Sequence, residues 1–158
     1  MIKLLLEREI VDPNHTDVNG RTPLGCAAFR GHEGVVRLLL EREDVDLNLP
    51  DKDGDGPLGC AAFAGHEGVV KLLLEHENFD PNHADVDGRT PLGCAAFEGH
   101  EGIVKLFLDR RDVDSNCLDK YGSTPLSYAA RRGHEGIMQL LQAQISVETP
   151  DAQLPHQA

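Results

Sequence analysis

The sequence has no tryptophan, and its aromatic side chains are five Phe and two Tyr in 158 residues. It is also poor in positive charge, because 15 Lys and Arg stand against 27 Asp and Glu, for a formal net charge of -12. This charge repels nucleic acid and anionic membrane surfaces, so we expect neither of them as a partner. No apolar run reaches the roughly 18 residues that a membrane-spanning helix needs.

Cysteine is scarce as well, with four residues at Cys26, Cys60, Cys94 and Cys117. The first residues, MIKLLLEREI, contain too short an apolar run for a signal peptide and already carry acids. These features predict reduced thiols in an intracellular, cytoplasmic protein. Because the first three cysteines recur at one spacing, we expect them to be small buried residues, and Cys117 to be an exposed thiol in a loop.

Internal repetition dominates the rest of the sequence. The tetrapeptide GHEG occurs at 31–34, 65–68, 99–102 and 133–136, which is a period of 34 residues. A period of this length indicates a solenoid in which each unit buries its apolar face against its neighbours. We divide the chain into a half unit 1–16, a first unit 17–50, a second unit 51–84, a third unit 85–118 and a fourth, capping unit 119–148.

Each unit contains the signals for a turn, two helices and a loop. In the first unit, an Asn-Gly turn is followed by Thr22, a helix N-cap residue, and by Pro23 at the first helical position. Gly31 is expected to end this short helix, and a second helix with a broad apolar face is expected from Glu33. The fold class predicted is all-α, a solenoid of stacked helix-turn-helix units with the turn tips along one edge.

The segment RTPLGCAAFRGHEGVVRLLLERE, repeated through the chain, resembles the ankyrin repeat pattern of Gly-x-Thr-Pro-Leu-His-x-Ala-Ala, Gly-His and Val-Val-x-Leu-Leu-Leu. The resemblance covers residues 1 to about 148, and the 34-residue unit is similar to those of ankyrin arrays in fungal NOD-like receptor proteins. The family's His after Pro-Leu is replaced by Gly25, Gly59 and Gly93, and by Ser127 in the fourth unit. Glycine weakens a helix by about 1 kcal/mol relative to Ala, so we expect soft first helices.

The two ends differ in polarity. In the fourth unit the segment LLLERE of the second helix becomes LLQAQI, which is typical of a C-terminal cap, and residues 149–158 are expected to form a disordered tail. The half unit 1–16 has lost its first helix, so we expect self-association through its uncapped apolar face and interpret the chain as the C-terminal piece of a longer array. That face carries Met1, Ile2, Leu4, Leu5 and Leu6.

Several motifs imitate catalytic or metal sites. The histidines of the GHEG segments are too far apart to share a zinc ion, and the resemblance implies that they bond backbone at the helix-helix turn. Residues 51–56 match the first half of a calcium loop, but Ala62 stands where the loop requires a bidentate Glu. We find no catalytic group, and we predict a non-enzymatic protein with no cofactor and no metal.

Function is therefore expected to depend on the surface. The resemblance implies that variable residues of turn tips and first helices face a partner on the concave side, with Phe29, Phe63 and Phe97 as a ladder of stacked rings. The alternative is that each ring packs between repeats. The candidate residues for binding a protein or peptide are Asn19, Arg21, Phe29, Arg30, Asp53, Asp55, Phe63, Asp87, Arg89, Phe97, Glu98, Tyr121, Ser123, Arg131 and Arg132.

Two functions remain open at this point. The first is a non-catalytic protein-protein interaction module, which in a receptor-like parent would be the ligand-sensing C-terminal array. The second is a structural spacer or self-association scaffold with no dedicated ligand. A spacer gives no reason for turn tips to vary while Phe stays in register, so the sequence favours the first.

Overall fold

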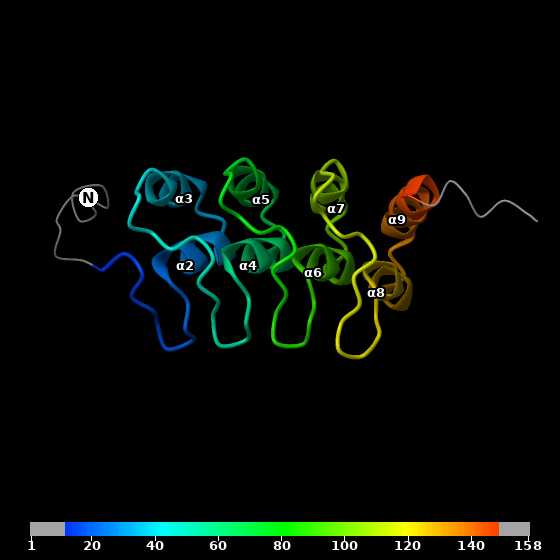
Figure 1. Ribbon diagram of the computed structural model, residues 1–158, viewed down its shortest axis with the longest axis horizontal. Coiled ribbons are helices and arrows are strands. Elements are labelled where there is room, and N and C mark those ends of the chain that lie inside the picture. Colours follow the sequence, from blue (N-terminus) through cyan, green and yellow to red (C-terminus); the bar gives the residue numbers. More distant parts are fainter. Residues whose placement is uncertain (1–11, 149–158) are drawn as a thin grey trace, which may run out of the picture.

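The computed structural model describes residues 12–148, and within this range every regular element is a helix (Figure 1). The predicted all-α fold of stacked helix-turn-helix units is confirmed. The helices are α2 (Pro23–Phe29), α3 (Glu33–Leu40), α4 (Pro57–Ala64), α5 (Glu67–Leu74), α6 (Pro91–Glu98), α7 (Glu101–Leu108), α8 (Pro125–Arg132) and α9 (Glu135–Glu148).

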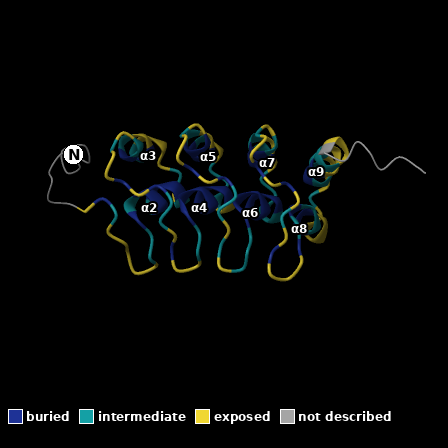
Figure 2. Cartoon of the chain, in the orientation of Figure 1, coloured by how far each residue is buried: buried dark blue, intermediate teal, exposed yellow. Residues whose placement is uncertain are grey.

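The helices form two layers, with α2, α4, α6 and α8 in one and α3, α5, α7 and α9 in the other (Figure 1). Loops between units project as hairpins from the side of the first layer. The core lies between the layers, where Leu58 and Ala61 of α4 and Val69 and Leu73 of α5 are buried. The inner helices α4 and α6 are mainly buried, whereas many residues at the hairpin tips are exposed (Figure 2).

The first helices begin where Thr and Pro predict them to begin. Thr22 Oγ1 accepts a hydrogen bond from the backbone N–H three residues later at 3.1 Å, and Thr90 does the same at 3.3 Å. Thr124 forms a full capping box with Ser127. Helix α4 has Gly56 at its N-cap and no side-chain cap. The second unit therefore has the weakest helix start among these four.

Three of the GHEG histidines connect neighbouring units rather than closing a turn within their own unit. His66 Nε2 donates to the carbonyl oxygen of Phe29 at 3.0 Å, and His100 Nε2 donates to that of Phe63 at the same distance. The bond to backbone was predicted correctly, but its partner lies in the preceding unit. A Cβ atom on Gly65 would lie 2.5 Å from the His100 ring, and Gly65 has φ +81°. Glycine there both ends α4 and makes room for the next histidine.

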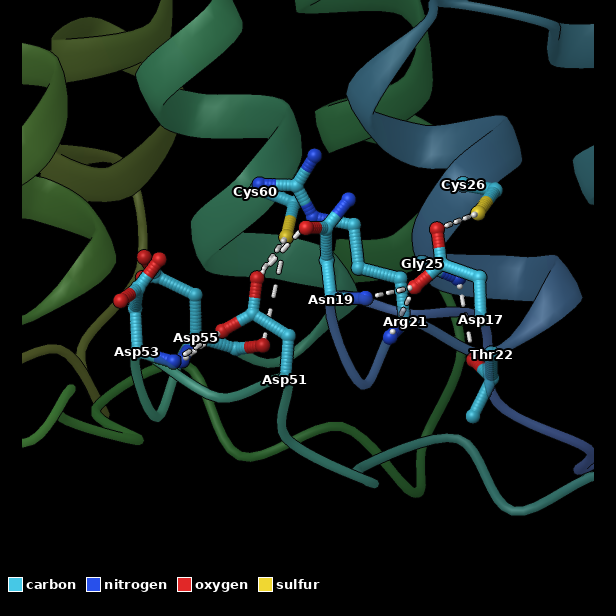
Figure 3. Close-up of polar contacts among 10 residues, drawn as sticks. All are labelled: Asp17, Asn19, Arg21, Thr22, Gly25, Cys26, Asp51, Asp53, Asp55 and Cys60. Atoms are coloured by element: carbon cyan, nitrogen blue, oxygen red, sulfur yellow. Dashed lines mark hydrogen bonds and ion pairs between the residues drawn. The ribbon is translucent and has the colours of Figure 1, made fainter.

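An aspartate opens every hairpin and organises it. Asp51 Oδ1 accepts hydrogen bonds from the backbone N–H groups of Asp53 and Asp55, at 2.9 and 3.1 Å (Figure 3). Adjacent hairpins are joined through their backbones, since the Lys52 N–H donates to the Asn19 carbonyl at 3.0 Å. The same aspartate contacts recur at Asp17, Asp85 and Asp119.

Asparagine side chains join the loops on the opposite edge. Asn82 Nδ2 donates to the Asp112 carbonyl at 2.7 Å, and Asn82 Oδ1 accepts from the Asp114 N–H at 2.8 Å. Asn14 makes the equivalent pair of bonds with the loop of the next unit. Each unit is thus tied to its neighbour at the hairpin, at the histidine and at the loop.

Some predictions fall outside the described residues. The apolar face of residues 1–11 and the tail 149–158 lie there, and the unit boundaries remain predictions. No helix in the range 12–148 has the length and apolarity to cross a membrane.

Candidate functional site

A groove of about 330 Å³ lies between the hairpins and the first helices of the first three units. We call it the hairpin-helix groove. Seven of the predicted partner-binding residues line it: Arg21, Phe29, Asp53, Asp55, Phe63, Asp87 and Arg89. It also contains four residues that the sequence analysis did not propose: Cys60, Asp85, Val86 and Cys94.

Phe63 is the most exposed of the three predicted phenyl rings. Its exposed fraction is 41%, whereas Phe29 and Phe97 are half-buried. The predicted exposure of Phe63 is confirmed, because this residue is not fully buried between repeats. The expected stack of three rings is wrong, because the only aromatic contacts recorded within residues 12–148 involve other partners. Phe97 instead meets Tyr128 edge to face at 5.7 Å.

Arginine side chains cover the other two rings. The Arg21 guanidinium carbon lies 4.0 Å from the ring centre of Phe29. Arg21 Nε also donates to Asp51 Oδ2 at 3.0 Å, a contact that links the first two hairpins (Figure 3). The Arg89 guanidinium carbon lies 5.5 Å from the ring centre of Phe97. These geometries are cation-π contacts, which hold each arginine over its ring in the groove wall.

Asp55 carries the most perturbed carboxyl group of the groove. Its pKa is raised to about 6, first by burial and then by the negative charges of Asp85 and Asp51. Arg89 opposes this rise, but it does not cancel it. The groove therefore holds negative charge that the surrounding side chains do not fully neutralise.

The glycine that replaces the family's histidine makes room for this carboxylate. A Cβ atom on Gly59 would lie 2.6 Å from Asp55 Oδ1, and one on Gly93 would lie 3.0 Å from Arg89 Cγ. From the sequence, these glycines were expected only to weaken the first helices. In the structure they let the fifth residue of the unit lie over the first turn of its own helix.

The groove cysteines are protonated at neutral pH. Burial raises the pKa of Cys60 to about 12 and raises that of Cys94 further still. Neutral thiols are poor nucleophiles, so these residues give the groove no reactive group. Cys117 is half-buried, with its Sγ 3.3 Å from Thr90 Oγ1, which corrects the expectation of an exposed thiol.

One cluster in the groove has the composition of a metal site. Ligand atoms of Asp55, Asp85 and Cys94 all lie within 4.8 Å of one another. However, Asp85 Oδ1 already accepts two hairpin N–H groups, from Asp87 at 2.9 Å and Arg89 at 2.8 Å. The positive charge of Arg89 also acts on both Asp55 and Cys94. These features disfavour a metal ion, whereas they leave Asp55 able to bind a further cationic group.

The other predicted residues do not line this groove. Tyr121 is 75% exposed and its hydroxyl donates to Asp87 Oδ1 at 3.3 Å. Ser123 is buried and accepts from Arg131, so its side chain is not presented to a partner. Arg132 lies over the Phe97 ring at 4.5 Å. The remaining predicted residues are Asn19 and Arg30, which are exposed, and Glu98, which pairs with Arg132 at 3.9 Å.

Comparison with known protein families agrees with this architecture. A family model described as Ankyrin repeats (3 copies) matches residues 1–85 and again residues 77–151. The chain belongs to the ankyrin repeat family. Ankyrin repeats are generally protein-protein interaction modules and are typically not catalytic. No curated protein sequence matches this chain.

Within this ankyrin array, two kinds of functional residue could have been found from the period. Asp17, Asp51 and their equivalents occupy one place in every unit, which indicates a shared structural role. Asp55 gives the opposite signal, because it stands where the units on either side have Arg21 and Arg89. The approach of Asp85 and Cys94 to Asp55 gave no signal in the sequence, since it depends on how two units stack.

Proposed function

We propose that this ankyrin repeat protein is a non-catalytic interaction module that binds a segment of a partner polypeptide in the hairpin-helix groove. The observation that carries the proposal is the exposed Phe63 ring within a groove of about 330 Å³ that spans three units. Aromatic side chains in such a position are frequent anchors of protein interfaces. Each unit is held to the next by backbone and side-chain bonds, so the groove is a rigid surface that needs little ordering on binding.

The test uses peptides selected from a random phage-displayed library on the whole protein. Peptides that bind are measured by calorimetry against Phe63→Ala and against Leu118→Ala as a matched control. Leu118 is 66% exposed, so its truncation removes a similar exposed apolar side chain outside the groove. We expect Phe63→Ala to weaken binding by about 10-fold or more.

The control variant is expected to bind as the unchanged protein does. Selected peptides that bind Phe63→Ala with unchanged affinity would place the partner elsewhere and contradict the proposal. A library that yields no binder would favour the alternative of a spacer. Because Phe63 is so exposed, its truncation should leave the thermal unfolding midpoint nearly unchanged, and a large loss would instead indicate a packing role.

A further inference from the structure

The first three units each carry a phenyl ring at the same position, and they differ in which side chain lies over that ring. The fifth residue of the unit lies beside the thirteenth. In the first unit this pair is Arg21 over Phe29 at 4.0 Å, and in the third it is Arg89 over Phe97 at 5.5 Å. The same backbone therefore places a guanidinium over the ring twice.

In the second unit the arginine is replaced by an acid. Asp55 occupies the fifth position, and its side chain is too short to cover Phe63. Within residues 12–148 the structure records no cationic side chain over this ring, which is 41% exposed. The second cation on Phe97 is Arg132 of the next unit, at 4.5 Å. The equivalent position relative to Phe63, 34 residues earlier, is Glu98.

Both places from which a cation covers Phe97 are thus held by acids around Phe63. More carboxylates gather in the groove, where Asp53, Asp85 and Asp87 also line the wall. An uncovered aromatic face next to the Asp55 carboxylate, whose charge Arg89 only partly offsets, attracts a cation through the ring quadrupole and through the carboxylate charge together. The neighbouring units show that the backbone geometry suits a guanidinium in this position.

We propose that the groove binds a cationic side chain of the partner polypeptide, an arginine in preference to a lysine, flat over Phe63 and with its head group at Asp55. This inference rests on the proposed function and names the chemistry of the partner. A volume of about 330 Å³ has room for one long side chain and for part of the peptide backbone. Arginine is favoured because its planar group can stack on the ring and donate to a carboxylate at the same time.

The test uses capped tripeptides, Ac-Ala-X-Ala-NH2, in which X is Arg, Lys, citrulline, Leu or Glu. Each is titrated into the whole isotope-labelled protein while the backbone amides of residues 53–63 are followed by NMR. We expect the Arg peptide to shift these amides and to bind about five-fold or more tightly than the citrulline peptide, its uncharged isostere. Lys should bind more weakly than Arg, and Glu should not shift these amides.

Two variants separate the ring from the carboxylate. Asp55→Arg places the protein's own guanidinium over Phe63, as in the flanking units, and is expected to abolish the shifts by the Arg peptide. Asp55→Asn is expected to remove the preference for Arg over citrulline. Glu75→Gln, which neutralises an exposed acid on the outer layer of the same unit, is the matched charge control and should change nothing.

Three outcomes would overturn the inference. Equal binding of the Arg and citrulline peptides, or tighter binding of Leu, would show an apolar site, and the proposed function would stand without its cationic partner. No shift by any tripeptide would overturn it too, while the phage selection would decide the proposed function separately. Shifts of the same amides by zinc alone, lost in Cys94→Ser, would assign the cluster to a metal ion.

Discussion

Replacing Asp55 by Asn should stabilise the folded protein, because Asp55 is ionised at neutral pH in surroundings that oppose its charge. Its pKa rises from an ordinary value of 3.8 to about 6, with burial as the first cause and with Asp85, Asp51 and Asp53 adding to it. Arg89 acts in the opposite sense. Each pKa unit corresponds to about 1.36 kcal/mol, so ionising Asp55 in the folded state costs at most about 3 kcal/mol. Partial exposure to water reduces this, and we expect a gain of about 1–2 kcal/mol.

The sign follows from which state holds the proton more tightly. Because the pKa of Asp55 is higher in the folded protein, its contribution favours folding most at low pH and is lost as pH rises from about 4 to about 6. Above that range the cost is constant. The stabilisation by Asp55→Asn should therefore be about 1 kcal/mol larger at pH 7.5 than at pH 5.

Urea denaturation at pH 5 and pH 7.5 measures this difference directly. Glu75→Gln serves as the control, because Glu75 is exposed and its neutralisation should give no comparable gain at either pH. An Asp55→Asn variant that is less stable than the unchanged protein at pH 7.5 would refute the reasoning. It would mean that groups of the folded protein already stabilise the Asp55 carboxylate, so that it needs no cation from a partner.

Three further predictions concern the array itself. Gly56→Thr should supply the missing cap of α4 and raise the stability by about 0.5–1 kcal/mol. The site accepts the new side chain, since Gly56 has an ordinary φ of -72° and the nearest contact of a new Cβ would be 3.6 Å. Amide exchange that shows 51–84 to be the best protected unit of the unchanged protein would contradict this. Asn82→Ala should cost about 1–2 kcal/mol in urea denaturation, because it removes both bonds to the next loop, and an unchanged midpoint would show that the loops are not coupled through it. Micromolar zinc or calcium should leave the melting temperature unmoved, so an upward shift would count against our interpretation of the Asp55, Asp85 and Cys94 cluster.

The helices were predictable because local signals and the period agree. Thr22 and Pro23 predict the start of α2, and the structure begins that helix at Pro23. The same signals return at Thr90 and Thr124, so the helix start predicted in one unit is supported by the equivalent residues of the other units. The missing cap at Gly56 was predictable for the same reason, since it is a departure from a repeated pattern.

The candidate site was less predictable, because it depends on contacts between units. Phe63 was proposed from its helical position, and the structure confirms that it is exposed. The arginine over Phe29 could not be inferred from a helical wheel, since Arg21 lies in the hairpin and reaches the ring only through the tertiary fold. The meeting of Asp55 with Asp85 requires the stacking register of two hairpins, which the spacing of 34 residues does not specify.

The central claim is that a partner polypeptide occupies the hairpin-helix groove beside Phe63. The most direct measurement is photocrosslinking in cells with benzoylphenylalanine at Val86, which lines the groove and is 53% exposed, and with the same group at Leu118 outside it. We predict a discrete crosslinked polypeptide from position 86 that Phe63→Ala removes, and none from position 118. Crosslinks of equal yield from both positions, or a crosslink at 86 that persists in Phe63→Ala, would contradict the account.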